Sequence, residues 1–300
     1  MDLGKLLTEQ RNDASRQIDT VSTVEMLGII NREDQKVASA VAEAIPAIGQ
    51  LVDAATERVR LGGRLFYIGA GTSGRLGVLD AAECPPTFSV PSDMVQGVIA
   101  GGESALSRAT EATEDDPEMG AHDLAAHGFT GKDVLVGIAA SGRTPYVLGA
   151  VVTARALGAV TAGISCSPGA ELSRLVDIAI ELIVGPEVLT GSTRMKSGTA
   201  TKLALNMITT GMMVRLGYTY GNLMVNVQPK NVKLVDRAVR IIADAAGVER
   251  VRAAELLDAS GRSVKTAIVM GKLGASCGDA EELLRHAGGR VSLALEGKKG

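Results

Sequence analysis

Hydrophobic and polar positions follow two different patterns along the chain. Through residues 21–60, apolar side chains recur every three or four positions, which predicts amphipathic helices. Ser22 and Thr23 suit the cap of the first helix, and Gly62-Gly63 ends the last one. Beyond these glycines the pattern changes to short, almost continuous apolar runs that end in small residues, as buried parallel strands do.

Five apolar runs of this kind predict five strands. They are RLFYIGAG (64–71), MVQGVIAGG (94–102), DVLVGIAAS (133–141), AVTAGIS (159–165) and IAIELIVG (178–185). Helical patterns separate most of them, notably 146–157 and 195–216. Strands that alternate with helices predict an α/β fold with a doubly wound parallel sheet, covered by helices on both faces. Ligands of such sheets bind beyond the carboxyl ends of the strands, so the turns after the strands are candidate sites.

The last part of the chain has a different texture. After Gly221 only helical patterns follow, beginning with VQPKNVKLVDRAVRIIADAAG and continuing in short pieces. We therefore expect three parts with different roles. These are N-terminal helices (1–60), the sheet domain (61–222) and a small all-helical C-terminal region (223–300) that serves packing or oligomer formation.

Composition narrows the function classes. The 300 residues, 46% of them apolar and 22% charged, suit one large α/β domain or a medium domain with a smaller companion. A net charge of −3 gives no basic surface for nucleic acid. Aromatic residues make up only 2% of the chain and tryptophan is absent, so hydrogen bonds and charge must dominate the binding of a polar ligand.

Cysteine usage and targeting signals favour the cytoplasm. Cys84, Cys166 and Cys277 form no C-x-x-C pair, and an odd count suits a reducing compartment. The N-terminal sequence lacks the basic, apolar and small-residue order of a signal peptide. No apolar run approaches the roughly 18 residues of a membrane span. We expect a cytoplasmic protein without a membrane partner.

Three turns at predicted strand ends combine small hydroxyls with glycine. Their candidate residues are Thr72 and Ser73 in the first turn, Ser141, Gly142 and Thr144 in the second, and Ser192, Thr193 and Lys196 in the third. Each turn opens a helix, where free N–H groups and the helix dipole favour an anion. Serine and threonine also cap helices without binding a ligand, but three such turns on one sheet edge favour a phosphate site.

The first turn also carries the G-x-G-x-x-G spacing of a dinucleotide site, at Gly69, Gly71 and Gly74. That site needs an acidic residue for the ribose about 20 residues further on, at the end of the second strand. Asp93 has this spacing but precedes the second strand. A sugar phosphate therefore fits the turn better than a dinucleotide.

Acidic residues near these turns are candidates for acid–base chemistry. Glu83 ends the helical stretch GRLGVLDAAE and comes shortly before Pro85, so we expect it in the last turn of a helix, where the dipole favours a neutral carboxyl. From the residues alone a structural role is equally open. Six more acids crowd the next segment, as at many solvated helix ends, and the residues alone select no base among them. They are Glu103, Glu111, Glu114, Asp115, Asp116 and Glu118.

The sequence does not decide the roles of the arginines in these turns, and its histidines do not indicate a metal site. Arg75, Arg143 and Arg194 accompany the three turns, and either phosphate contact or structural ion pairing fits each of them. The three histidines show no metal-ligand spacing. Cys84, next to Glu83, has no histidine near it in the sequence, so a buried thiol is favoured over a nucleophile.

These motifs together resemble the N-acetylmuramic acid 6-phosphate etherases, bacterial enzymes of the sugar isomerase (SIS) fold. The resemblance covers nearly the whole chain, from TEQRNDASRQIDTVSTVEMLGIINREDQKV near the N-terminus to GNLMVNV. Between these segments it includes LDAAECPPTF, IAGGESALSRATEATEDD, GIAASGRTPYV, GISCSPGAELS and VGPEVLTGSTRMKSGTATKLALNM. Several of the motifs are long and unusual in composition, which argues against chance.

The resemblance implies cleavage of the D-lactyl ether of N-acetylmuramic acid 6-phosphate to N-acetylglucosamine 6-phosphate and D-lactate, in the recovery of cell-wall amino sugar. It implies no metal or organic cofactor, and a homodimer with sites near the subunit interface. It assigns Glu114 as the base at C2 and Glu83 as the acid that protonates the departing lactyl oxygen. Such an elimination needs one ionised and one protonated carboxyl.

Two other functions fit the same turns. A sugar-phosphate sensor like the glucokinase regulatory protein would bind its ligand without needing two carboxylates. An aldose–ketose isomerase on the same fold would use a base at C2 but release no lactate. The presence of both Glu83 and Glu114, in a chain about one sugar isomerase unit long, favours the etherase.

Overall fold

The computed structural model describes residues 6–108 and 113–297 of the chain. Internal contacts divide it into two compact units, Met1–Glu83 with Ser92–Thr209 and Cys84–Pro91 with Thr210–Gly300. Within the described residues no single helix has the length and apolar character to span a bilayer. The bent pair Thr23–Glu43 and Ile45–Arg60 meets those two criteria only when its halves are taken together.

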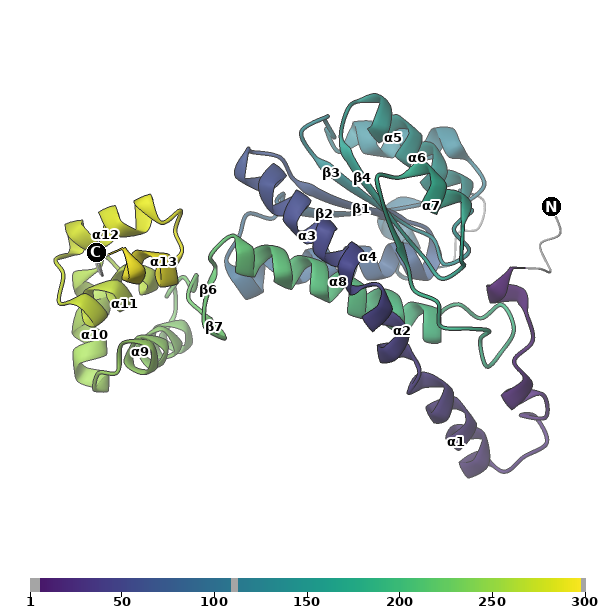
Figure 1. Cartoon of the computed structure of the whole chain (residues 1–300), viewed down its shortest axis with the longest axis horizontal. Helices are drawn as coiled ribbons and strands as arrows, with labels where there is room; N and C mark the ends of the chain where they lie inside the picture. The colour runs from purple at the N-terminus through teal and green to yellow at the C-terminus, as the bar shows by residue number, and fades with distance from the viewer. Residues whose placement is uncertain (1–5, 109–112, 298–300) are drawn as a thin grey trace. The chain divides into compact units, whose positions relative to one another are not determined.

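Short helices precede the sheet in the first unit (Figure 1). In chain order they are the 3₁₀ turns η2 (Leu7–Glu9) and η3 (Asp13–Ser15), then α1 (Thr23–Asp34), α2 (Val37–Glu43) and α3 (Ile45–Arg60). The Oγ atom of Ser22 accepts a hydrogen bond from the N–H of Glu25 at 3.3 Å, which confirms the predicted cap of α1. Pro46 stands in the first turn of α3, a position that tolerates its missing N–H.

The predicted parallel sheet is confirmed in the number and direction of its strands. The strands are β1 (Leu65–Gly69), β2 (Val95–Ile99), β3 (Val134–Ile138), β4 (Val160–Ser165) and β5 (Ile178–Glu181), in the spatial order β2-β1-β3-β4-β5 and all parallel. Gly69, the last residue of β1, pairs with Ile99 on one side and Ile138 on the other. The carboxyl ends therefore align along one edge of the sheet.

Helices cover both faces of the sheet. One face packs against α5 (Pro117–Ala126), α6 (Pro145–Ala156) and α7 (Glu171–Leu175), seen together at the top of Figure 1. Its core includes Phe66 and Ile68 of β1 with Tyr146 and Leu172 of the helices. Tyr67, between them in the strand, points to the opposite face, where α4 (Gly71–Phe88) and α8 (Lys196–Arg215) lie. Successive side chains of β1 thus point to opposite faces of the sheet and pack against two separate layers of helices.

The end of α4 corrects one expectation. We predicted that this helix would stop at Glu83, before Pro85, but it continues through Pro85 and Pro86 to Phe88. Neither proline can donate a hydrogen bond to the preceding turn, and the exposed Ala82 and Glu83 leave that part of the helix open to water. Glu83 is therefore not in the last turn of the helix, and the dipole argument for its neutral form does not hold.

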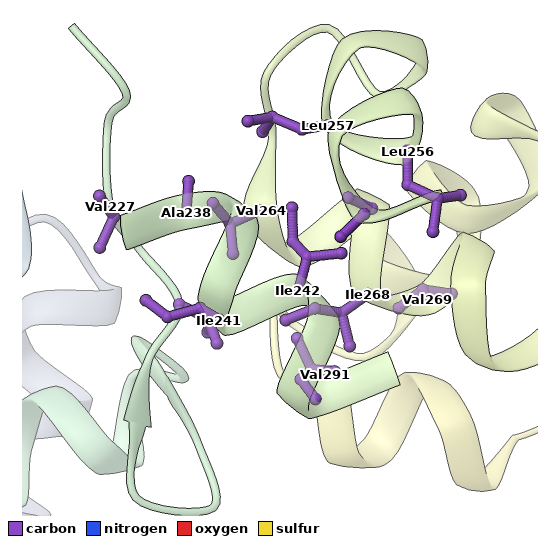
Figure 2. Close-up of a cluster of buried hydrophobic side chains, with 14 of the residues drawn as sticks. Val227, Ala238, Ile241, Ile242, Leu256, Leu257, Val264, Ile268, Val269 and Val291 are labelled. Atoms are coloured by element: carbon purple, nitrogen blue, oxygen red, sulfur yellow. The ribbon is translucent and has the colours of Figure 1, made fainter. Parts of the chain in front are cut away.

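The C-terminal unit has a hydrophobic core of its own. It contains α9 (Val232–Ala246), α10 (Arg250–Ala259), α11 (Val264–Leu273), α12 (Cys277–His286) and α13 (Val291–Glu296). Ile242, Leu256 and Ile268 from three of these helices meet at its centre (Figure 2). A small antiparallel pair, β6 (Thr219–Tyr220) with β7 (Leu223–Met224), precedes the helices. The sequence did not indicate this pair, because two-residue strands carry no periodic pattern.

Candidate active site

The strand order places the first two hydroxyl turns on either side of the switch point of the sheet. In the order β2-β1-β3-β4-β5 the connections that leave β1 and β3 run to opposite faces of the sheet. Doubly wound sheets bind their ligands at this switch point, beyond the carboxyl ends of the strands. The turn after β1 contains Thr72 and Ser73, and the turn after β3 contains Ser141 and Thr144; all four side chains are partly exposed.

The glycines of the first turn serve its tight geometry. A Cβ on Gly74 would lie 2.6 Å from the carbonyl oxygen of Gly69, so strand and helix approach too closely for a side chain. Gly71 has φ +52°, in the left-handed region that disfavours other residues. The G-x-G-x-x-G spacing is therefore explained by the turn itself, without a dinucleotide.

Glu114 joins the first two turns. Its backbone carbonyl accepts a hydrogen bond from the N–H of Tyr146 at 3.1 Å, which fixes it beside the start of α6. Its Oε1 atom lies 3.3 Å from the point where a Cβ on Gly71 would stand, at the N-terminus of α4. The positive end of the α4 dipole faces this carboxylate. Of the six acids in the predicted cluster, Glu111 lies outside the described residues.

The third turn adjoins the first. The Cγ2 atom of Thr72 lies 3.6 Å from where a Cβ on Gly198 would stand, so the N-termini of α4 and α8 are neighbours. The Cys166 thiol after β4 donates to the carbonyl of Ser197 at 3.9 Å, which ties the same turn to the sheet. Thr72, Ser192 and Thr193 thus belong to adjacent turns at one edge of the sheet.

Gly142 has its backbone groups committed to the second turn. Its N–H donates to the carbonyl of Ala139 at 2.8 Å, and its carbonyl accepts from the N–H of Leu172 at 2.9 Å. Its φ is +67°, and a Cβ there would lie 2.3 Å from the Cβ of Ala170. Gly142 shapes the turn that presents Ser141 and Thr144.

A buried carboxylate caps α8 from within the chain. Glu187 is fully buried and accepts hydrogen bonds from the N–H groups of Lys196 at 3.0 Å and Ser197 at 2.8 Å. The prediction of free N–H groups is therefore wrong at these two residues of the third turn. These two N–H groups are therefore not available to an anion at this turn.

Lys196 is buried in an ion pair instead of facing the hydroxyl turns. Its side chain is 1% exposed, and its Nζ atom donates to Glu33 of α1 at 2.7 Å. Asn12 and Lys36 donate to the same carboxylate. Burial alone would raise the pKa of Glu33, but the hydrogen bonds from Lys196, Lys36 and Asn12 lower it to about 2.

The N-terminal segment holds the chain that leads into the third turn. Asn12 donates to the carbonyl of Pro186 at 3.0 Å, and Ser15 donates to the carbonyl of Val188 at 2.7 Å. The N–H of Gly191 donates to the carbonyl of Thr8 at 3.0 Å. We call residues 8–15 the N-terminal strap. Sequence reasoning assigned the strap no role, because its partners lie more than 170 residues away.

Glu83 lies apart from these turns. It is exposed, and it lines a groove of about 230 Å³ between α4 and α8, together with Leu79, Lys202 and Asn206. It follows Gly71 by 12 residues in α4, so at about 1.5 Å per residue the two lie roughly 18 Å apart along the helix. Within one chain the structure therefore separates Glu83 from Glu114 and the hydroxyl turns.

Beneath Glu83 lies a buried carboxylate that sequence reasoning missed. Asp80 accepts hydrogen bonds from Asn206 at 2.8 Å, Thr209 at 3.3 Å and Tyr67 at 3.1 Å. Burial, with a smaller contribution from the charge of Glu83, raises its pKa against the effect of these hydrogen bonds. The three donors tie β1, α4 and α8 together under the groove.

Among the remaining polar residues, one has a structural role and another is a candidate binding residue that sequence reasoning missed. Arg75 donates to the carbonyls of Ala105 at 3.0 Å and Arg108 at 3.2 Å, which supports the turn η4 (Gly102–Leu106) after β2. Cys84 is buried, as predicted. Ser167, in the turn after β4, is buried, and its Oγ atom has no hydrogen-bond partner among the described residues. Hydroxyls at this strand end were the signal that could have identified it.

The described residues contain no metal-binding constellation. Within residues 6–108 and 113–297, no group of three or more histidine, cysteine, aspartate or glutamate side chains could hold a metal ion.

Comparison with known proteins agrees with this architecture. A family model described as "Glucokinase regulatory protein N-terminal SIS domain" matches residues 46–155, and one described as "SIS domain" matches residues 118–211. The chain is 53% identical over 295 residues to the N-acetylmuramic acid 6-phosphate etherase of Klebsiella aerogenes, covering 98% of each chain. The chain belongs to the N-acetylmuramic acid 6-phosphate etherase family.

Other relatives and a solved structure extend the comparison. The etherase of Serratia proteamaculans is 54% identical over 295 residues, covering 98% of this chain and 99% of that protein. A phosphoheptose isomerase from Neisseria gonorrhoeae has a TM-score of 0.48 at 17% identity, covering 63% of this chain and 100% of that one. Membership of the etherase family confirms the family predicted from the sequence motifs.

Proposed function

We propose that this protein cleaves the D-lactyl ether of N-acetylmuramic acid 6-phosphate, giving N-acetylglucosamine 6-phosphate and D-lactate. The observation that carries the proposal is the identity of about 53% with etherases over nearly the full length of both chains. The reaction would serve the recovery or catabolism of cell-wall amino sugar. The enzyme is a carbon–oxygen lyase.

The chemistry requires a base and an acid on neighbouring carbons. Opening of the sugar ring exposes an aldehyde at C1, which acidifies the proton on C2. A base removes that proton, the C3–O bond breaks, and an acid protonates the departing lactyl oxygen. Water then adds to C3 of the unsaturated aldehyde and the ring closes. Each proton transfer needs its catalytic group within about 3 Å of the reacting atom.

Glu114 is the proposed base at C2. Its carboxylate lies at the N-terminus of α4, where the helix dipole favours an anion, and its backbone is fixed between the first two turns. Glu83 is the proposed acid at the lactyl oxygen. This role rests on the family's assignment, because in the isolated chain Glu83 lies in a separate groove.

The phosphate would bind to the hydroxyls of the three turns. The proposed donors are Thr72, Ser73, Ser141, Thr144, Ser192 and Thr193. Gly142 and Lys196 support the site without touching the phosphate, since the backbone of Gly142 is hydrogen-bonded within its turn and Lys196 is paired with Glu33. Ser167 joins the candidates, because its buried hydroxyl has no partner among the described residues.

We further propose a homodimer that acts in the cytoplasm. Three free cysteines suit a reducing compartment. The dimer follows the family expectation, and no cofactor is required by the chemistry above, since two carboxyls and water supply every proton and the hydroxyl.

One assay tests the function. The protein is incubated with N-acetylmuramic acid 6-phosphate in heavy water, and D-lactate and deuterium at C2 are both measured. We expect both. The Glu114→Gln variant should lose both signals, because no base remains at C2. The Glu83→Gln variant should lose lactate release more than deuterium exchange, because the first proton transfer needs only the base.

The matched control is Glu118→Gln, which neutralises an exposed acid of the same cluster in the first turn of α5. It should leave both signals at the wild-type level. Lactate release at the parental rate in Glu83→Gln would contradict the role given to Glu83.

A sensor function is the second candidate, because the glucokinase regulatory protein model matches residues 46–155. A sensor would bind the sugar phosphate without releasing lactate or exchanging the C2 proton. If calorimetry detects binding of the sugar phosphate but neither D-lactate nor deuterium at C2 appears, the protein is a sensor and not an etherase.

A further inference from the structure

The groove that contains Glu83 also contains a cation to which the mechanism above gives no role. This groove encloses about 230 Å³ between α4 and α8, and Lys202 of α8 lines it together with Glu83 of α4. Lys202 is exposed, and its ammonium forms no ion pair with a carboxylate of the described residues. It is also the one cation among the described residues that line the groove, so an anion from outside the chain can take it as a partner.

Helical spacing places three kinds of side chain around the same small volume. Leu79 and Glu83 are four residues apart on α4, so their side chains share one face of that helix. Lys202 and Asn206 have the same spacing on α8. Asn206 donates to Asp80 of α4 at 2.8 Å, which holds the two helices together at the groove. The groove therefore presents an acid, a cation and an apolar side chain to one ligand.

The lactyl group of the proposed substrate has the matching chemistry. Its ether oxygen, its carboxylate and its methyl group are all attached to the same carbon atom, so a residue that binds one of them lies close to the other two. The proposed role of Glu83 is to protonate the ether oxygen, which brings the lactyl carbon to this groove. The carboxylate then loses part of its hydration, and this loss is costly unless a positive group pairs with it.

We propose that Lys202 binds the carboxylate of the lactyl group, so that the enzyme recognises the group that it removes. Leu79, which is 50% exposed, offers the apolar contact for the lactyl methyl group. Lys202 and Glu83 belong to the same compact unit, so the cation accompanies the acid to the substrate. The inference rests on the proposed function, which supplies the lactyl ether and the role of Glu83.

Two substrates and two enzymes test this pairing. The substrates are N-acetylmuramic acid 6-phosphate and its analogue with a primary amide in place of the lactyl carboxylate. Release of N-acetylglucosamine 6-phosphate, the product common to both, is measured. Lys202→Gln should lower kcat/KM for the acid by about 10- to 100-fold, because a charge-assisted hydrogen bond is lost. It should lower kcat/KM for the amide by less than about twofold, since the neutral amide forms no such bond.

Two further variants separate a charge pairing from a structural role. Lys202→Arg keeps the positive charge and should retain most of the activity on the acid. The matched control is Lys132→Gln, at an exposed lysine in the turn before β3, at the amino end of that strand. It should leave the rates on both substrates at the wild-type level. An equal loss on acid and amide in Lys202→Gln, or no loss on the acid, would overturn the proposal.

Failure of the function is distinguishable from failure of the pairing. If the wild-type protein releases no N-acetylglucosamine 6-phosphate from the acid, the proposed function is wrong and the pairing falls with it. If the wild type is active on the acid and Lys202→Gln does not distinguish acid from amide, the function stands and only the role of Lys202 is wrong.

Discussion

At the scale of single residues, Gly71 combines backbone geometry with the position of the proposed base. Its φ of +52° disfavours a side chain, and a Cβ there would stand 3.3 Å from Oε1 of Glu114. The glycine of the first turn therefore keeps room for the proposed base. The sequence motif alone suggested a nucleotide or phosphate, whereas the neighbouring group is a carboxylate of the protein itself.

Substitution of Gly71 by alanine should impair activity more than stability. The left-handed backbone costs about 1–2 kcal/mol of unfolding free energy. Displacement of Glu114 should lower kcat by about a hundredfold, as ångström-scale misplacements do. The control is Gly62→Ala, at φ +84°, where no described atom lies within 4 Å of the new Cβ. Equal loss of activity in both variants, in lactate assays and denaturant melts, would contradict the contact with Glu114.

Asp80 should destabilise the fold at neutral pH. Its pKa is raised by burial first and by the nearby charge of Glu83. An acid with a raised pKa in the folded state binds its proton more tightly there, so its contribution to stability is present at low pH and is lost as pH rises. Asp80→Asn should therefore unfold at a higher temperature than wild type at pH 7, with a smaller advantage near pH 3. The amide can bond the same partners, because the hydroxyls of Tyr67 and Thr209 also accept. A variant less stable than wild type at pH 7 would contradict this sign.

At the scale of elements, the hydrophobic pattern predicted those strands and helices whose formation depends on nearby residues. The five strands and the long helices α6 and α8 follow from periods that a short window contains. Two features of α4 and α8 could not be predicted this way. The helix α4 passes through Pro85 and Pro86, and α8 is capped by Glu187, nine residues before Lys196 in the chain.

The N-terminal strap and the ion pair of α1 depend on contacts between distant segments. Asn12 and Pro186, which are hydrogen-bonded, lie 174 residues apart in the sequence. The buried pair of Glu33 and Lys196 has a similar separation of 163 residues. A sequence window cannot contain such contacts, so Lys196 was predicted as a phosphate contact from its position in the turn alone.

Removal of the charge of Glu33 should weaken the link between α1 and α8. Glu33→Gln leaves the ammonium of Lys196 buried without its counter-ion, which we expect to cost about 3–5 kcal/mol of unfolding free energy at pH 7. The folded pKa of Glu33 is about 2, below its ordinary value of 4.5, so its stabilisation is present above pH 4.5 and is lost as pH falls toward 2. The difference from wild type should therefore shrink across that range in urea titrations.

The control for this variant is Glu25→Gln, an exposed glutamate on the same helix. It should change the unfolding free energy by less than about 0.5 kcal/mol. A pH-independent difference between Glu33→Gln and wild type would show that the ion pair is not the source of the effect.

At the scale of the whole molecule, the chain consists of two units with separate cores. One core lies against the parallel sheet, and the other lies among α9–α13. Stability is therefore expected to be a property of each unit, with local openings that differ between them.

A cavity in the C-terminal core should destabilise the C-terminal unit without affecting the sheet. Ile242→Ala removes a fully buried side chain and should cost about 2–5 kcal/mol. Hydrogen exchange should quicken in residues 232–296 and stay unchanged in the strands of the sheet. Val251→Ala, at a side chain that is 75% exposed in the same unit, should change neither region. Equal acceleration in both units would contradict separate cores.

The strap also bears on how the protein is handled in the laboratory. Thr8, Asn12 and Ser15 brace the segment from Pro186 to Gly191, immediately before two proposed phosphate donors. Trimming or proteolysis at the front of the chain would therefore loosen substrate binding first, while the sheet remained folded. A purification tag fused in front of these residues would therefore lie close in sequence to a segment that supports substrate binding.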